Sequence, residues 1–296
     1  MAEFVTRFAP SPTGPLHLGH AYSAMLAHDM AVAEGGTFLL RIEDIDRSRC
    51  RPEWEAQIYD DLRWLGLFWP EPVMRQSTRM AVYQQTLDRL WSREALFPCT
   101  CSRRDIDQAL SAPQEGVSPV IGPDGPVYPG ICRAHQTQFS HHPRPEGVLR
   151  LRMDEIISDH AAMQGSWGEF QFKETGLGPK GETGVIRFAG SELHKNVGDI
   201  ALCRRDMATS YHLSVVLDDA AQGVSHVVRG QDLFEATKIH VLLQWVLGLP
   251  TPIYHHHRLI RDTAGKRLAK RDDARALSKY RADGASPADI RRLVGL

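Results

Sequence analysis

The stretch RFAPSPTGPLHLGH, residues 7–20, decides how the first part of the chain is expected to fold. Apolar and polar residues alternate over residues 4–9, which predicts a short buried strand. The prolines and the glycine predict a tight turn, and residues 21–33, rich in Ala, Met and Leu, predict a helix. A Gly-Gly pair ends that helix, and residues 37–42 predict a second strand. The stretch therefore organises a βαβ unit.

His17 and His20 fall where the N-terminus of this helix is expected. Free backbone N–H groups and the helix dipole attract anionic groups at such an end. Imidazole N–H groups can hydrogen-bond a phosphate, and Gly19 leaves room for a flat base above the backbone. These residues predict a nucleotide site. Taken alone, the pattern His-x-Gly-His more often marks two partly exposed histidines that cap a helix.

The combination of Arg-Phe-Ala-Pro-Ser-Pro-Thr-Gly-x-Leu with residues 17–20 resembles the signature of class I glutamyl-tRNA synthetases. In that resemblance His-Leu-Gly-His is the HIGH motif. It implies that His17, Gly19 and His20 bind ATP. It also implies that the two histidines act in catalysis by electrostatic stabilisation and positioning, not as nucleophiles.

Length and composition describe an ordinary soluble protein. The 296 residues are 42% hydrophobic and 24% charged, and the formal net charge of −1 gives no global attraction to nucleic acid. The N-terminus lacks the apolar core of a signal peptide, and no run is long enough to span a membrane. We therefore expect a cytoplasmic monomer with no membrane partner, whose five cysteines form no disulfides.

Three carboxylates follow the second expected strand in RIEDID, residues 41–46. A solvated acidic loop is the simplest explanation, and it suffices for Asp46. Glu43 and Asp44 fall at the C-terminal end of a strand, where open α/β sheets place ligand groups. An acid at that position can accept hydrogen bonds from an ammonium group. The resemblance implies that Glu43 holds the α-amino group of glutamate.

Residues 97 to about 145 are dense in Pro, Gly and His, and predict an insertion with little helix beyond 103–110. Such a segment cannot readily build its own core, so a metal is expected to hold it together. Cys99, Cys101 and Cys132 offer three ligands to one zinc ion. Three buried thiols without a metal are the alternative.

The fourth zinc ligand has four candidates, Tyr128, His135, His141 and His142. General ligand chemistry favours His135, because imidazole is a far commoner zinc ligand than phenol. The pattern Cys-x-Cys followed by Tyr-x-x-x-Cys is similar to the zinc site of a truncated branch of the glutamyl-tRNA synthetase family. That resemblance implies Tyr128 as the ligand.

The α/β pattern resumes at residues 199–206, and a helix is expected from Ser210 with Tyr211 in its first turns. Residues 225–233 predict a strand that ends near Arg229. A strand-end arginine can hold a carboxylate through two N–H groups, although a surface ion pair fits the pattern equally. This run resembles the second half of the synthetase active-site sheet. The resemblance implies a glutamate pocket lined by Arg7, Ala9, Ser11, Glu43, Tyr211 and Arg229.

The basic stretch GKRLAKR, residues 265–271, is the last one that suggests chemistry. Such a run is usually a solvated face or a loose RNA contact, but a loop carrying Lys270 can also close over a triphosphate and neutralise developing charge. The stretch resembles the KMSKS motif, with Arg267 in place of the first Lys and Ala269 in place of Ser. The resemblance implies that Lys270 is catalytic and that Lys270 and Arg267 bind ATP.

The fold expected from these patterns is a Rossmann-like doubly wound parallel sheet, split by a zinc-bearing insertion. We expect the first half at 1–96, the insertion at 97–190, the second half at 191–262, and the KMSKS-like loop with a short helical segment at 263–296. A helix start is expected at Ser286 and Pro287. No anticodon-binding domain is expected.

The resemblance implies a ligase that activates L-glutamate with ATP, with Mg²⁺ on the phosphates, and passes the glutamyl group to an RNA hydroxyl. In the truncated branch the acceptor is queuosine in the anticodon of tRNA(Asp). Alternatives are charging of a tRNA 3′ end, an adenylating ligase for a small carboxylic acid without RNA, and a non-catalytic tRNA-binding module.

Overall fold

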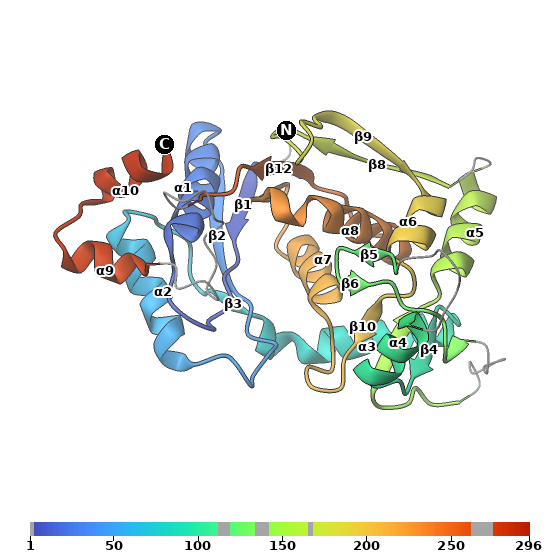
Figure 1. Ribbon diagram of the computed structural model, residues 1–296. Helices are drawn as coiled ribbons and strands as arrows, with labels where there is room; N and C mark the ends of the chain where they lie inside the picture. The colour runs from blue at the N-terminus through green and yellow to red at the C-terminus, as the bar shows by residue number, and fades with distance from the viewer. Residues whose placement is uncertain (1–2, 112–118, 134–141, 165–167, 262–274) are drawn as a thin grey trace.

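The computed structural model describes residues 3–111, 119–133, 142–164, 168–261 and 275–296 (Figure 1). Arg267 and Lys270 of the KMSKS-like stretch lie outside the described residues, as do two candidate zinc ligands, His135 and His141. Their roles stay predictions.

Helices and strands alternate along most of the chain. The helices are α1 (Leu18–Ala33), α2 (Pro52–Trp64), α3 (Met80–Ser92), α4 (Arg103–Ser111), α5 (Met153–Gln164), α6 (Gly190–Asn196), α7 (Tyr211–Ala221), α8 (Phe234–Leu247), α9 (Leu277–Ala282) and α10 (Pro287–Val294), with short 3-10 turns η1 (Gln76–Arg79) and η3 (Gln231–Leu233). The strands are β1 (Val5–Phe8), β2 (Thr37–Ile42), β3 (Met74–Arg75), β4 (Leu96–Cys99), β5 (Ile121–Gly122), β6 (Gly125–Pro126), β7 (Val148–Leu151), β8 (Glu169–Glu174), β9 (Gly184–Ala189), β10 (Ala201–Cys203), β11 (His226–Gly230) and β12 (Ile253–His257).

A parallel arrangement of strands forms the centre of the fold. β2 pairs in parallel with β1 and β3, and β12 pairs in parallel with β11 and β8. β1 lies beside β11, where the Ser225 amide donates to the Val5 carbonyl at 3.0 Å and the Val5 amide donates to Ser225 Oγ at 2.8 Å. The strands therefore follow the order β3, β2, β1, β11, β12, β8, with β9 antiparallel at the edge. The order reverses between β1 and β11, which is where open α/β sheets bind ligands.

The insertion has its own small antiparallel sheet, in which β7 lies between β4 and β10. Figure 1 shows α4 and β4 at one end of the molecule and, at the other, α10 beside α1 and α9 beside α2. Ile290 and Val294 of α10 are buried in the same core cluster as Ala21 and Met25 of α1. None of the helices in the described residues is long and apolar enough to cross a membrane.

The predicted βαβ unit is confirmed as β1, α1 and β2. α1 begins at Leu18, earlier than the predicted start at residue 21, because His17 is its N-cap. The amphipathic stretches at 52–65 and 83–91 also form helices, α2 and α3. Ser210 and Ser286 are N-caps, and Pro287 is the first residue of α10, as predicted.

The region between the two halves holds more regular structure than the sequence suggested. α5 was not predicted, and neither was β9, whose segment is dominated by glycines. β8 and β9 pair over residues 169–174 and 184–189, and β8 joins β12 where Glu174 is the partner of Tyr254. Residues 169–189, assigned to the insertion by the sequence, thus extend the sheet of the second half.

A substitution in the turn between α1 and β2 tests how closely this unit is packed. A Cβ on Gly36 would lie 1.9 Å from the Phe4 carbonyl oxygen, so Gly36→Ala must push the turn away from the start of β1. We expect a loss of about 2 kcal/mol in the free energy of unfolding in urea. Val32→Ala, at a position that is 64% exposed in the same helix end, should change it by less than about 0.5 kcal/mol. An unchanged stability of Gly36→Ala would contradict the described contact.

Candidate active site

The two histidines of the HLGH stretch cap the first helix with their own rings. The Gly19 amide donates to Nδ1 of His17 at 3.1 Å, and the His17 amide donates to Nδ1 of His20 at 3.2 Å. Since both Nδ1 atoms accept, each neutral ring carries its proton on Nε2. The rings lie 3.8 Å apart between centroids. The cap thus aligns two Nε2–H donors at the N-terminus of α1, where an anion is favoured.

Gly19 is required by this arrangement. A Cβ at that position would lie 3.0 Å from Cε1 and 3.1 Å from Nδ1 of His17. Any side chain there would therefore press on the ring that caps the helix. The space above Gly19, which the sequence predicted for a flat base, is thus occupied first by the His17 imidazole.

A cavity of about 370 Å³ opens at the ends of the central strands, beside the histidine cap. Eight of the residues predicted to bind glutamate or ATP line it, and these are Arg7, Ala9, His17, Gly19, His20, Glu43, Tyr211 and Arg229. Ser11, the remaining predicted glutamate residue that the structure describes, is exposed and does not line this cavity. The sequence did not single out Asp232, His257 or Ile260, which also line it. No motif marked these three, since His257 is the last residue of β12 and the other two follow β11 and β12 outside any recognised pattern.

A buried group of four charged residues lies at the cavity, which two of them, Arg7 and Glu43, line. Arg7 donates to both carboxylate oxygens of Asp219 in α7, at 3.0 and 3.2 Å. Arg41 in β2 donates to Asp219 at 2.6 Å and to Glu43 at 3.1 Å. No role was predicted for Arg41 or Asp219 from the sequence. The available signal was an arginine inside an otherwise apolar strand, which needs a buried partner.

The charges of this group depend on each other. Burial by itself would raise the pKa of Asp219, but the guanidinium groups of Arg7 and Arg41 outweigh it and hold that pKa below its usual range. Burial raises the pKa of Glu43, and Arg41 and Arg7 offset only part of this effect. The two arginines therefore neutralise the buried negative charge of Glu43 only in part. A bound ammonium group would supply the missing positive charge.

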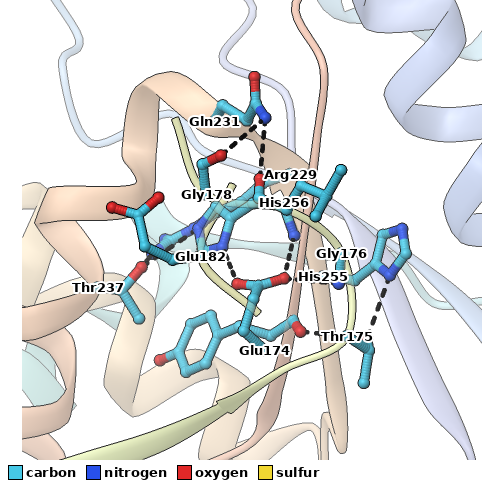
Figure 2. A network of polar contacts seen from close by, with 12 residues as sticks. Glu174, Thr175, Gly176, Gly178, Glu182, Arg229, Gln231, Thr237, His255 and His256 are labelled. Carbon is cyan, nitrogen blue, oxygen red and sulfur yellow. Dashed lines mark hydrogen bonds and ion pairs between the residues drawn. The ribbon is translucent and has the colours of Figure 1, made fainter. Parts of the chain in front are cut away.

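Arg229 is held from behind by a second buried network, drawn in Figure 2. Its Nε donates to Nε2 of His256 at 3.1 Å, and its Nη2 donates to Thr237 Oγ1 at 2.7 Å and to the Leu233 carbonyl at 3.3 Å. His256 in turn has Nδ1 2.5 Å from the buried carboxylate of Glu174. Because Nε2 of His256 accepts, its proton lies on Nδ1 and faces Glu174.

The predicted fork from Arg229 to a carboxylate is not available in this arrangement. Nη1 also donates to Nδ1 of His240 at 3.1 Å, so four of the five N–H groups are occupied. One Nη1–H is left for the cavity. Arg7 uses Nε and Nη2 on Asp219, and within the described residues its Nη1 has no hydrogen-bond partner. Arg229 can therefore offer a single donor to a ligand carboxylate, whereas Arg7 keeps both Nη1–H groups and its second Nη2–H.

The cavity combines groups that match an amino acid with an acidic side chain. Glu43 can hold an ammonium group, and Arg7 and Arg229 can each take a carboxylate oxygen. The Nε2–H donors of His17 and His20 suit phosphate oxygens. The arrangement brings an anionic nucleotide and a carboxylate together in one site.

Three cysteines come together in the insertion. The Sγ atoms of Cys99, Cys101 and Cys132 lie within 4.8 Å of one another, and the Tyr128 hydroxyl is 3.6 Å from the first two. Burial alone would raise the pKa of Cys132, but hydrogen bonds from Tyr128 and the Thr100 amide lower it to about 6, which favours the thiolate that binds metals. Three thiolates and one oxygen are a donor set that zinc accepts.

His142, one candidate for the fourth ligand, does not join this cluster. It is exposed, and no histidine among the described residues comes within reach of the three sulfurs.

Comparison with known proteins agrees with this fold and site. The model of the family "tRNA synthetases class I (E and Q), catalytic domain" matches residues 3–296. The chain belongs to this family, as the sequence analysis predicted.

Several similar proteins carry one name, glutamyl-Q tRNA(Asp) synthetase. The protein of that name from Rhodobacter capsulatus is 63% identical over 292 residues, which cover 99% of this chain and all of that protein. The one from Methylococcus capsulatus is 38% identical, covering 94% of this chain and 79% of that protein. The one from Symbiobacterium thermophilum is 39% identical, with 96% and 83% covered.

Two solved structures share the fold. They are a glutamate tRNA ligase from Elizabethkingia meningosepticum in complex with its amino acid, with a TM-score of 0.70 and 24% identity, and the glutamate-tRNA synthetase of Elizabethkingia anophelis, with 0.71 and 23%. Both matches cover 99% of this chain, which spans only 60% and 61% of theirs. The Rossmann-like synthetase fold predicted from the sequence is confirmed.

Gly19→Ala tests the histidine cap. The added Cβ displaces the His17 ring, so we expect binding of a non-hydrolysable ATP analogue to weaken about tenfold, as for one hydrogen bond to a charged group. Titration calorimetry measures this. The better helix propensity of alanine and the loss of the N-cap are each worth about 1 kcal/mol and oppose each other, so the thermal midpoint should change little. Unchanged affinity in a folded variant would show that the cap does not contact the nucleotide.

Proposed function

We propose that the protein activates L-glutamate with ATP and transfers the glutamyl group to queuosine in the anticodon of tRNA(Asp). The observation that carries this proposal is the placement of Glu43, Arg7 and Arg229 around one cavity beside the histidine cap. The similar proteins named glutamyl-Q tRNA(Asp) synthetase, 63% identical over nearly the whole chain in one case, support the choice of acceptor. ATP and tRNA as substrates are consistent with a cytoplasmic enzyme.

In the first step an α-carboxylate oxygen of glutamate attacks the α-phosphorus of ATP. The bond from that phosphorus to the bridging oxygen breaks, so that pyrophosphate leaves and glutamyl-adenylate forms. Glu43 orients the amino group of glutamate, and Arg7 and Arg229 each donate to a carboxylate oxygen of glutamate. His17 and His20 donate to phosphate oxygens of ATP. Ser11, Lys270 and Arg267 keep the roles implied by the family resemblance. Mg²⁺ bound with ATP supplies charge neutralisation on the phosphates.

In the second step a hydroxyl oxygen of the queuosine ring attacks the glutamyl carbonyl carbon. The ester bond forms, the bond from that carbon to the anhydride oxygen breaks, AMP leaves with the electron pair, and the hydroxyl proton passes to the leaving phosphate. An anticodon loop suits this chemistry, because an unpaired base can be turned out of the loop into a protein pocket. No protein nucleophile is needed in either step.

The acceptor is the point on which the alternatives differ. An ordinary synthetase would place glutamate on a tRNA 3′ end, and a ligase without RNA would use a small molecule. A non-catalytic tRNA-binding module would need no ordered pocket, yet Arg7, Glu43 and Arg229 are each buried and held by charged or hydrogen-bonded partners.

Charging of purified tRNA with labelled glutamate decides the acceptor. We expect label on tRNA(Asp) from normal cells and none on tRNA from cells that cannot make queuosine. Mild alkali, which hydrolyses esters, should release the label, and nuclease digestion should locate it at the first anticodon position. Equal charging of tRNA without queuosine, or label on the 3′ end of tRNA(Glu), would contradict the proposed acceptor.

We further propose that the cysteine cluster holds one structural zinc ion, with Cys99, Cys101, Cys132 and the Tyr128 oxygen as ligands. Burial raises the pKa of the Tyr128 hydroxyl, so a phenolate at this position needs the charge of a metal ion. The 2.7 Å hydrogen bond from the Cys132 amide to the Tyr128 oxygen would then stabilise the negative charge further. The Arg150 guanidinium, 3.8 Å from the centroid of the Tyr128 ring, supplies further positive charge. The ion would join β4 to the segment that carries Tyr128 and Cys132.

Metal analysis of Tyr128→Phe tests this site. The protein as purified should carry about one zinc ion per chain, and the Phe variant should lose it to a mild chelator that leaves the parent protein loaded. Tyr280→Phe, which removes a hydroxyl in α9, should behave like the parent. A protein prepared without chelators that holds no zinc would overturn the site, and loss of zinc on His135→Ala alone would make His135 the fourth ligand.

A further inference from the structure

A chain of hydrogen bonds leads from Arg229 away from the cavity and into the insertion. Nη1 of Arg229 donates to Nδ1 of His240 in α8, at 3.1 Å. Nε2 of His240 lies 3.0 Å from Nδ1 of His212 in α7, and Nε2 of His212 lies 2.9 Å from Oδ1 of Asp124. The four side chains come from β11, α8, α7 and the turn between β5 and β6. They are separated by up to about a hundred positions in the chain.

The direction of every bond in this chain is fixed by its two ends. A guanidinium can only donate, so Nδ1 of His240 accepts and its proton lies on Nε2. That proton can only go to Nδ1 of His212, whose own proton then lies on Nε2 and is donated to the Asp124 carboxylate. Both rings are buried and neutral in this scheme. Burial and the neighbouring Arg229 lower the pKa of His240 well below its usual value, in keeping with a neutral ring.

The last residue of this hydrogen-bonded series, Asp124, belongs to the β5–β6 hairpin, residues 121–126. The hairpin is packed closely against the body of the protein. A Cβ on Gly122 would lie 2.3 Å from the carbonyl oxygen of Asn196, at the end of α6. A Cβ on Gly198 would lie 2.7 Å from Val127. Asp124 is 38% exposed and lines a surface hollow of about 680 Å³ together with Cys101 and Tyr128 of the cysteine cluster. The hairpin therefore connects the insertion to the amino-acid pocket.

We propose that Asp124, His212 and His240 are positioning residues that fix the orientation of the Arg229 guanidinium, so that glutamate affinity depends on the seating of the β5–β6 hairpin. The inference rests on the proposed function, in which Arg229 binds glutamate.

Three sets of contacts orient the planar guanidinium of Arg229. His256, backed by Glu174, holds Nε (Figure 2), Thr237 and the Leu233 carbonyl hold Nη2, and His240 with its partners holds Nη1. Nη1 carries the N–H that is left for the cavity, and His240 is its hydrogen-bond partner among the described residues. Weakening the His240 contact therefore loosens the guanidinium at the nitrogen that serves the cavity, and the donor is held less firmly for a carboxylate.

Steady-state pyrophosphate exchange with Asp124→Ala tests the inference, because Asp124 lies at the surface and outside the binding site. We expect the KM for glutamate to rise about fivefold, as for the loss of one hydrogen bond, with kcat and the KM for ATP changed less than about twofold. Asp124→Asn keeps Oδ1 as an acceptor and should restore most of the affinity. Asp206→Ala, an exposed aspartate lining the same hollow, should leave the KM for glutamate unchanged.

Two further measurements separate positioning from general damage. Gly122→Ala, which must shift the hairpin without touching any polar member of the chain, should raise the KM for glutamate in the same way. NMR of ¹⁵N-histidine-labelled protein should find His212 and His240 as Nε2–H tautomers, and Asp124→Ala should change the spectrum of both.

An unchanged KM for glutamate in Asp124→Ala, with the parent enzyme active, would overturn the inference alone. So would an equal rise in the KM for ATP, or an Nδ1–H tautomer of His212. Absence of any glutamate-dependent exchange in the parent protein would instead contradict the proposed function.

Discussion

The active site depends on the buried carboxylate of Asp219. It accepts hydrogen bonds from Arg7 in β1 and from Arg41 in β2, and thereby ties α7 of the second half to both strands of the first. Removing it would leave two guanidinium groups buried without their partner, which is far more costly than losing a surface ion pair. The same carboxylate turns Arg7 so that its remaining Nη1 is left for the cavity. It also leaves Arg41 with a donor for Glu43. The hydrogen bonds of Asp219 therefore both shape the substrate pocket and hold the two halves of the fold together.

Much of the fold follows from local sequence. The turn between residues 9 and 17, the helix after it and the Gly-Gly pair predict β1, α1 and β2, because each element ends at a residue that cannot continue it. The amphipathic patterns of α2 and α3 and the serine caps of α7 and α10 work in the same way. β9 escapes prediction, since its strand character comes from pairing with β8 across a glycine-rich segment. β8 alternates apolar and polar residues, as its sequence predicts, but β9 has no such alternation of its own.

The site could be predicted where a motif holds its residues together, and not where partners come from distant elements. His17, Gly19 and His20 make their contacts within four residues, so the sequence contains the whole cap. Arg229 was predicted to fork a carboxylate because a strand-end arginine with free donors does so. The structure instead surrounds it with His240, His256 and Thr237, none of which is a neighbour in sequence. What an arginine can offer a ligand is set by what its other nitrogens already bind.

The central claim is that Glu43, Arg7 and Arg229 form a pocket for a free acidic amino acid. The most direct measurement is ATP–pyrophosphate exchange in the absence of RNA, comparing glutamate with glutamine. The account predicts exchange with glutamate and a kcat/KM for glutamine lower by roughly a hundredfold or more, because the amide leaves an arginine donor without its charged partner. Equal exchange with the two amino acids, or none with glutamate, would contradict it.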